Sequence, residues 1–216
     1  MQEEWDKLFT KFSRITDGLS MPIDSDILET VVALNALGIN TTMSCGGHID
    51  ERGLLLPWID IESPDPTLEE IRSEEIKIAR ESRVFRNEVY RLVDEKADWA
   101  QVKIAQDRLH EKEGEMRRVQ LRERAIHRVE RDKLLPYLSQ FYENRLIPYD
   151  RRLILSVRPN SGKSRLENQG AGDFYFFSPL EIQQQKLAEY REEMNAFAHF
   201  LKACYFSQQS LVSVSL

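Results

Sequence analysis

Cysteines and long apolar runs are scarce in this sequence of 216 residues. Its two cysteines, Cys45 and Cys204, are too few for the disulfide framework that supports many small secreted proteins. No stretch approaches the roughly 18–20 consecutive apolar residues that span a bilayer. The first residues, Met1–Trp5, are acidic and lack the basic start and apolar run of a signal peptide. We therefore expect a cytoplasmic protein with reduced thiols and no membrane contact.

An excess of positive charge is also absent. Thirty Lys and Arg residues oppose 36 Asp and Glu residues, which gives a formal net charge of −6. Nucleic-acid binding relies on clustered cations that neutralise phosphates, so the composition argues against nucleic acid as the main partner. The charge is unevenly distributed: residues 67–145 contain 17 acidic and 18 basic residues, whereas the other 137 positions contain 19 and 12. The net negative charge thus belongs to the two ends of the chain.

The two ends show both helical and strand patterns. Apolar residues from Trp5 to Ile15 recur at the helical spacing, which predicts an amphipathic helix over residues 3–16. Alternating apolar and polar residues predict strands at 39–45 and 54–61 that together form a hairpin. The remaining predictions are a helix over 27–37, strands at 152–157, 164–168 and 173–177, a helix from 180 to 204, and a loose end or edge strand at 207–216.

The charged middle of the chain shows a helical repeat. Ile71, Ile78, Phe85, Leu92 and Trp99 are spaced seven apart, which predicts a narrow apolar seam on otherwise solvated helices. We expect these helices to fold back as an antiparallel hairpin, with the reversal near residues 96–101 or at Gly114, and His110 and His127 to be exposed. The predicted fold class is α+β: a small antiparallel sheet packed by the N- and C-terminal helices, with an inserted long charged α-helical hairpin. The predicted domains are a body of residues 1–65 and 146–216 and an arm of residues 66–145.

The segment Thr41–His48 carries the residue types most typical of a functional site. Cys45 and His48 are three residues apart in a turn, and an adjacent imidazole can activate a thiol as a nucleophile. Asp60, on the partner strand, is predicted to orient His48, so Cys45, His48 and Asp60 form the candidate catalytic set. The structural alternative is a buried cysteine beside a turn histidine. We predict no metal and no cofactor, because a zinc site would need Cys204, His199 or Asp60 to complete the ligand set.

The same loop could also hold an anion. Backbone amides at Ser44, Gly46 and Gly47 can point toward a negative group. The turn between the strands at 152–157 and 164–168 is basic, and its Arg158, Lys163 and Arg165 could neutralise a small anionic ligand such as a nucleotide. The alternative is a solvated surface turn. The segment 161–164, Ser-Gly-Lys-Ser, is not interpreted as a P-loop, because Val157 occupies the first glycine position and no helix is predicted to follow.

Part of this region resembles other sequences. Ser44–His48 followed by Pro57–Ile61 resembles a Ser-Cys-x-Gly-His and Pro-Trp-hydrophobic-Asp pattern of uncharacterised bacterial proteins. This resemblance implies a shared site and no particular reaction. Thr41–Cys45 is also similar to a Thr-Ser-Ser-Cys-Ser-Gly-Arg stretch of the wybutosine-synthesis methyltransferase family. Gly46 replaces the Ser that follows the Cys of that stretch, and His48 replaces its Arg, so its activity is not transferred.

Two functions are therefore predicted as alternatives. The first is binding of a small anionic ligand at the Ser44–His48 loop, with thiol chemistry at Cys45, and whether a reaction is catalysed is left open. The second is a non-enzymatic interaction or oligomerisation module, in which the arm 67–145 contacts a protein partner or a second copy. Trp58 is interpreted as a core residue rather than a wall of the site.

Overall fold

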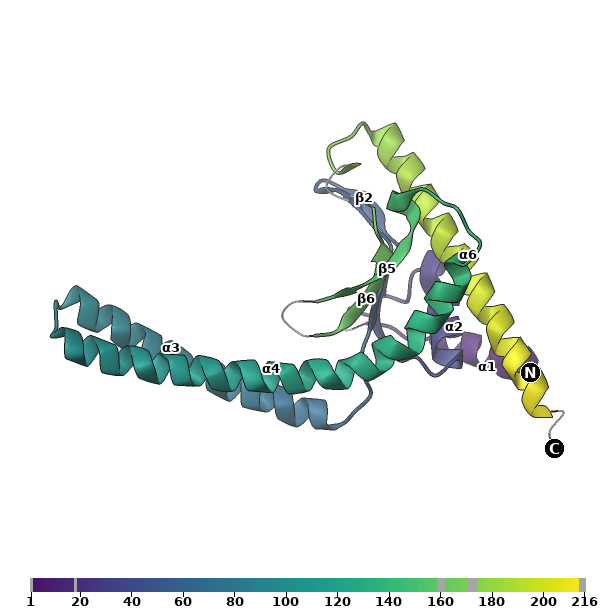
Figure 1. The fold of residues 1–216 in the computed structure, drawn as a ribbon. Coiled ribbons are helices and arrows are strands. Elements are labelled where there is room, and N and C mark those ends of the chain that lie inside the picture. Colours follow the sequence, from purple (N-terminus) through teal and green to yellow (C-terminus); the bar gives the residue numbers. More distant parts are fainter. Residues whose placement is uncertain (1, 18, 159–161, 171–174, 214–216) are drawn as a thin grey trace. The chain divides into compact units, whose positions relative to one another are not determined.

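The structure is a computed structural model that describes residues 2–17, 19–158, 162–170 and 175–213 (Figure 1). The chain divides into two compact units. The sheet unit comprises residues 1–63, 128–158 and 163–216, and the hairpin unit comprises residues 64–127 and 159–162. Within the described residues, no helix is long and apolar enough to cross a membrane.

The sheet unit contains a four-stranded antiparallel sheet with the order β1-β4-β6-β5. The strands are β1 (Thr41–Cys45), β4 (Trp58–Ile61), β5 (Leu153–Val157) and β6 (Ser164–Asn168). A separate two-stranded sheet, β2 (His48–Asp50) and β3 (Gly53–Leu55), lies in the connection between β1 and β4. A short 3-10 helix, η1 (Tyr149–Arg151), precedes β5.

Helices α1 (Gln2–Phe12), α2 (Ser25–Ala36) and α6 (Leu180–Ser213) pack with this sheet (Figure 1). Alternate strand residues point to opposite faces of a sheet. Ile59, Ile61 and Leu166 therefore share one face, and all three are fully buried against α2 and α6 in the main core. Trp58, Asp60 and Arg165 share the other face, so the polar site residues of β4 and β6 lie on the side opposite the main core.

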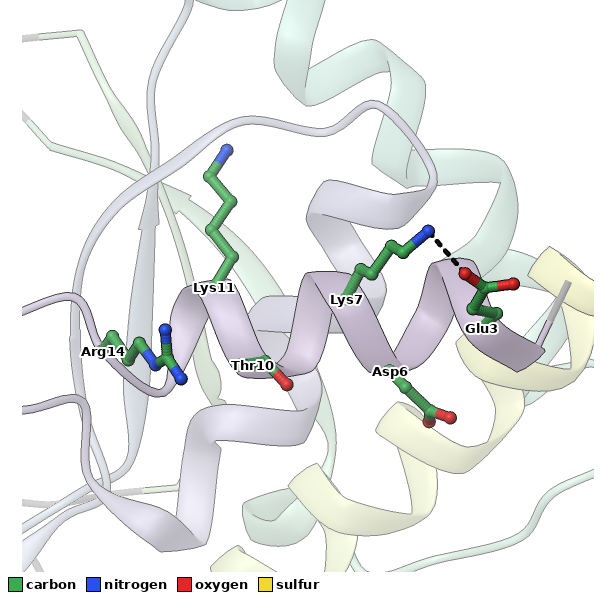
Figure 2. A pocket seen from close by; sticks show the side chains of 6 residues that line it. All are labelled: Glu3, Asp6, Lys7, Thr10, Lys11 and Arg14. Atoms are coloured by element: carbon green, nitrogen blue, oxygen red, sulfur yellow. Dashed lines mark ion pairs between the residues drawn. The ribbon is translucent and has the colours of Figure 1, made fainter.

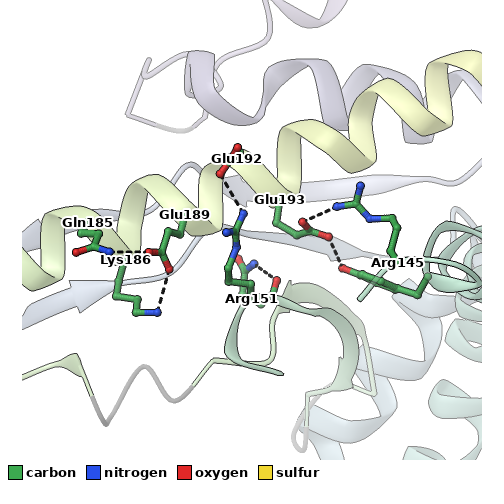
Figure 3. Close-up of polar contacts among 9 residues, drawn as sticks. Arg145, Arg151, Gln185, Lys186, Glu189, Glu192 and Glu193 are labelled. Carbon is green, nitrogen blue, oxygen red and sulfur yellow. Dashed lines mark hydrogen bonds and ion pairs between the residues drawn. The ribbon is translucent and has the colours of Figure 1, made fainter. Parts of the chain in front are cut away.

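A buried polar network connects α6 with residues 142–153 (Figure 3). The Tyr142 hydroxyl donates to Oε1 of Glu193 at 2.9 Å and accepts from the Leu153 amide at 2.8 Å. Arg145 Nη2 lies 2.8 Å from Oε2 of Glu193. Burial raises the pKa of Tyr142, so this hydroxyl stays protonated and available as a donor. The network joins α6 to the start of β5 and to the end of helix α4 (Trp99–Tyr142).

The hairpin unit contains α3 (Thr67–Asp94) and the first part of α4. Its seam is apolar in two separate clusters, one around Ile71, Ile78 and Val119, the other around Val89 and Val102. Ion pairs join the two helices on their exposed sides, such as Lys112 Nζ with Glu81 at 2.9 Å. The unit is therefore a thin helical pair with one narrow apolar seam and many surface charges.

The α+β class, with a small antiparallel sheet, flanking terminal helices and long central helices, is confirmed. The hairpin reverses between Asp94 and Trp99, within the first predicted position, and α4 passes through Gly114 without a break. The exposure predicted for His127 is wrong, because its side chain is buried beside Glu123, with the His127 Nε2 atom 3.6 Å from Oε1. A helix-internal histidine among charges can face a neighbouring helix, which the sequence pattern alone does not show.

Three element predictions also need correction. The strand predicted over 54–61 is broken before Trp58, because Pro57 cannot donate to a sheet ladder. The tail predicted to be loose is helical through Ser213, while residues 214–216 lie outside the described chain. The strand predicted over 173–177 lies partly outside the described residues, and in its described part Tyr175 is helical and Phe176 and Phe177 form a turn.

Candidate functional site

The candidate site is the tight connection between β1 and β2. Strand β1 ends at Cys45 and β2 begins at His48, so only Gly46 and Gly47 separate the two side chains. The Cys45 sulfur lies 3.6 Å from Nδ1 of His48, which is within contact distance for a thiol and an imidazole. Cys45 is half-buried and the His48 side chain is 51% exposed. The predicted pairing of thiol and imidazole is therefore present, and small molecules can reach the imidazole.

The carboxylate beside His48 belongs to Asp50, and the prediction that Asp60 orients His48 is wrong. Nε2 of His48 lies 3.5 Å from Oδ2 of Asp50, two residues further along β2. Asp50 also accepts from the backbone amide of Arg52 and from its guanidinium, whose Nη2 lies at 2.9 Å. These hydrogen bonds from Arg52 lower the pKa of Asp50, which keeps the carboxylate ionised beside the imidazole. Cys45, His48 and Asp50 thus form a thiol–imidazole–carboxylate series within six consecutive residues.

Asp60 belongs to a ladder of ion pairs on the sheet face that carries Trp58. Its two oxygens accept from Arg165 at 2.6 and 2.9 Å. The Arg165 guanidinium also lies 3.6 Å from the centre of the Trp58 ring. Trp58 is therefore a half-buried residue that packs on this ion pair, and it is not part of the main core as the sequence predicted. Lys163 pairs with Glu62 at 2.7 Å in the same way. Two of the three cations predicted for an anionic ligand are therefore held by carboxylates of the protein itself.

The third predicted cation, Arg158, is exposed at the end of the β5–β6 turn, where its amide donates to the carbonyl of Lys163. β5 and β6 pair antiparallel on either side of this segment, whose residues 159–161 lie outside the described residues. Ser44, on the core side of β1 opposite Ile59, is half-buried. It lines a cleft of about 190 Å³ between β1 and residues 12–31, together with Thr41, Thr42 and Met43.

The backbone of the two glycines is hydrogen-bonded to charged side chains from elsewhere in the chain. The Gly46 amide donates to Oδ2 of Asp24 at 2.7 Å, so the predicted anion-binding amide is occupied by a carboxylate of the protein. The carbonyls of Gly46 and Gly47 accept from Nε and Nη2 of Arg191 at 2.9 and 2.7 Å. Arg191 in turn pairs with Asp26 at 2.9 Å. The turn between Cys45 and His48 is therefore fixed by residues of α6 and of the start of α2.

Sequence reasoning missed four residues of this arrangement: Asp24, Asp26, Asp50 and Arg191. Asp50 had a local signal, because it is two residues from His48 in a strand and such residues share a face. Asp24 and Asp26 lie at the start of a helix, where a capping role is the ordinary expectation for an aspartate. Arg191 is more than 140 positions away along the chain from the loop that it contacts, and on its helix it had no distinguishing pattern.

Other hollows do not form a comparable site. A hollow of about 600 Å³ lies along α1, lined by Glu3, Asp6, Lys7, Thr10, Lys11 and Arg14 (Figure 2). Five of the six residues lie on α1 and Arg14 follows two residues after its end, and the ion pair of Lys7 with Glu3 is mostly exposed, so no second element encloses a ligand. Among the described residues, no group of three or more His, Cys, Asp or Glu side chains could hold a metal ion.

Comparisons with family models, with curated proteins and with solved structures find no match for this chain. Fold and site therefore define its class: an α+β protein with a helical hairpin and a Cys–His–Asp series in one tight turn. The pattern shared with uncharacterised bacterial proteins stays a prediction.

Proposed function

We propose that the Cys45–His48 turn is the site of a thiol-dependent reaction on a small substrate. The observation that carries this proposal is the series of contacts from the Cys45 sulfur to His48 at 3.6 Å and from His48 to Asp50 at 3.5 Å. In such a series the imidazole takes the thiol proton, and the carboxylate orients the ring and stabilises its charged form. Contacts of this length before substrate binding are typical of catalytic groups that tighten in the complex.

Replacing His48 by Asn is expected to slow the alkylation of Cys45 by iodoacetamide about tenfold at pH 7. The thiolate is the reacting species, and the variant lacks the imidazole that accepts the proton. The measurement is the second-order rate constant in a Cys204→Ser background, followed by mass spectrometry. In the wild type, Cys45 should react faster than Cys204, because burial raises the pKa of the Cys204 thiol.

The matched control is His199→Asn, because His199 is an exposed histidine that lies 3.6 Å from Glu29, away from the turn. It should leave the Cys45 rate unchanged. Equal rates for Cys45 and Cys204, or an unchanged rate in His48→Asn, would contradict the proposal. Repeating the labelling with millimolar inorganic phosphate or ATP tests the predicted anionic ligand, which should protect Cys45.

A second candidate function is self-association through the hairpin unit. Apolar side chains near its reversal are exposed, Trp99 by 67% and Tyr90 by 62%, together with Val93 and Ile104. Large exposed apolar groups close together are typical of interaction surfaces. The exposed groups at the reversal favour contact with a second copy through this end of the hairpin.

Light scattering of the full chain between about 5 and 200 µM should then show a concentration-dependent dimer. Trp99→Glu should shift the dissociation constant upward at least tenfold, since one buried indole can contribute more than 1.4 kcal/mol to an interface. Ile76→Glu is the matched control, because Ile76 is an exposed apolar residue elsewhere on α3. A monomer over the whole range, or equal effects of both variants, would refute self-association.

A further inference from the structure

Arg191 makes an unusual set of contacts for a residue of a long surface helix. Its Nε and Nη2 donate to the carbonyls of Gly46 and Gly47, and its Nη1 pairs with Asp26. All three nitrogens of one guanidinium are therefore committed, two of them to adjacent peptide groups. A planar guanidinium that binds two neighbouring acceptors fixes their orientation as well as their distance, which an ammonium cannot do in the same way.

Asp24 binds the same loop through the Gly46 amide, and a local capping bond of the helix is given up for this contact. Asp24 occupies the N-cap position of α2, where its side chain would normally accept from an amide of the first turn. It makes no such capping bond, and its Oδ2 accepts instead from the Gly46 amide at 2.7 Å. A local rule broken in favour of a distant loop is typical of a site that must be held in one geometry.

Gly47 shows how tightly the loop is confined. Its φ of +75° lies in the left-handed region, and a Cβ there would come within 2.9 Å of the Leu55 carbonyl oxygen. The peptide groups next to Gly47 thus have their conformation set by sterics and their orientation set by Arg191. Since only Gly46 and Gly47 join Cys45 to His48, the orientation of these peptides determines the separation of thiol and imidazole.

We propose that Arg191 is a positioning residue for the Cys45–His48 pair, with Asp24 as a second positioning residue that binds the Gly46 amide. This inference rests on the proposed thiol function, because it assigns Arg191 a role in that reaction without contact to substrate. Arg191 acts by holding the carbonyls of Gly46 and Gly47 toward α6. Asp24 acts by holding the Gly46 amide toward α2, and together they keep the sulfur next to Nδ1 of His48.

A double-mutant cycle on the alkylation rate of Cys45 tests this role. Arg191→Gln alone should slow labelling by iodoacetamide at pH 7 about five- to tenfold, close to the effect of His48→Asn. The double variant should be no slower than His48→Asn, because Arg191 acts through the imidazole and has nothing to position once it is gone. Arg191→Lys should recover part of the rate, since its ammonium can still donate to one carbonyl. Asp24→Ala, at an exposed residue, should slow labelling in the same non-additive way.

The matched control is Lys202→Met, which removes another ion pair between α6 and α2, that of Lys202 with Glu29 at 2.7 Å. It should change the thermal midpoint without changing the labelling rate. The inference is overturned if Arg191→Gln leaves the rate unchanged while His48→Asn lowers it, and in that case the proposed function survives. It is also overturned if the effects of Arg191→Gln and His48→Asn on the rate multiply, because Arg191 then acts independently of the imidazole. If His48→Asn has no effect either, the proposed function itself fails.

Discussion

Glu193→Ala is expected to lower the free energy of unfolding by about 3 kcal/mol, a large part of the stability of a domain of this size. The Glu193 side chain is 2% exposed and accepts from both the Tyr142 hydroxyl and Arg145 (Figure 3). Without it, the Arg145 guanidinium can turn toward water, since it is already 37% exposed. The buried Tyr142 hydroxyl would lose its acceptor while still accepting from the Leu153 amide, and an unsatisfied buried donor is costly.

Urea unfolding followed by circular dichroism measures this effect. The adjacent Glu192→Ala is the matched control, because Glu192 pairs with Arg151 at 3.0 Å from a side chain that is 74% exposed. Exposed pairs of this kind contribute little, so the control should change stability by less than about 0.5 kcal/mol. Equal losses in the two variants would show that the network does not stabilise α6 in the way described.

Gly47→Ala is expected to be the most damaging small change in the candidate site, with a loss of about 3–4 kcal/mol. The left-handed conformation alone costs a residue with a Cβ about 1–2 kcal/mol. The new Cβ would also meet the Leu55 carbonyl oxygen and the Pro57 ring, each at 2.9 Å, and neither can move without a backbone shift. Because the strain falls between Cys45 and His48, the variant should also lose the His48-dependent part of the Cys45 labelling rate.

Gly38→Ala separates the cost of the left-handed conformation from the cost of the steric contacts. Gly38 has a φ of +74°, almost the same as Gly47, but a Cβ there would have no atom within 4 Å. It should therefore cost only the conformational part, about 1–2 kcal/mol. Chemical denaturation and Cys45 labelling of both variants give the comparison. A Gly47→Ala protein as stable as Gly38→Ala, with normal labelling, would mean that the loop is not confined as the contacts indicate.

Local patterns were sufficient to predict most of the fold. The seven-residue repeat of Ile71, Ile78 and Leu92 predicted the buried seam of the hairpin, because a narrow apolar stripe on a helix requires a partner helix. The alternation from Thr41 to Cys45 predicted β1, and the apolar spacing over 27–37 predicted α2. The α+β class followed from these elements together.

The errors lay where neighbours along the chain did not decide the outcome. Trp99 continues the seven-residue repeat, but it lies just after the reversal and is exposed, so the repeat no longer faces a partner helix there. His127 was expected among solvated charges and is buried, with its Nε2 atom 3.6 Å from Glu123 one turn earlier on α4. A repeat identifies one face of a helix, and only the partner's position decides whether that face is covered.

The candidate site divides in the same way. The spacing of Cys45 and His48 was enough to predict that thiol and imidazole could meet across the Gly-Gly turn, and the structure brings them to 3.6 Å. The partners of these charged groups depend on the tertiary structure. Arg165 pairs with Asp60, Asp50 lies beside His48, and Arg191 donates to the two glycine carbonyls. The physical reason is that carboxylates and guanidinium groups pair by distance in space. Strand register and the packing of α6 set those distances, and neither is encoded in the local spacing of residues.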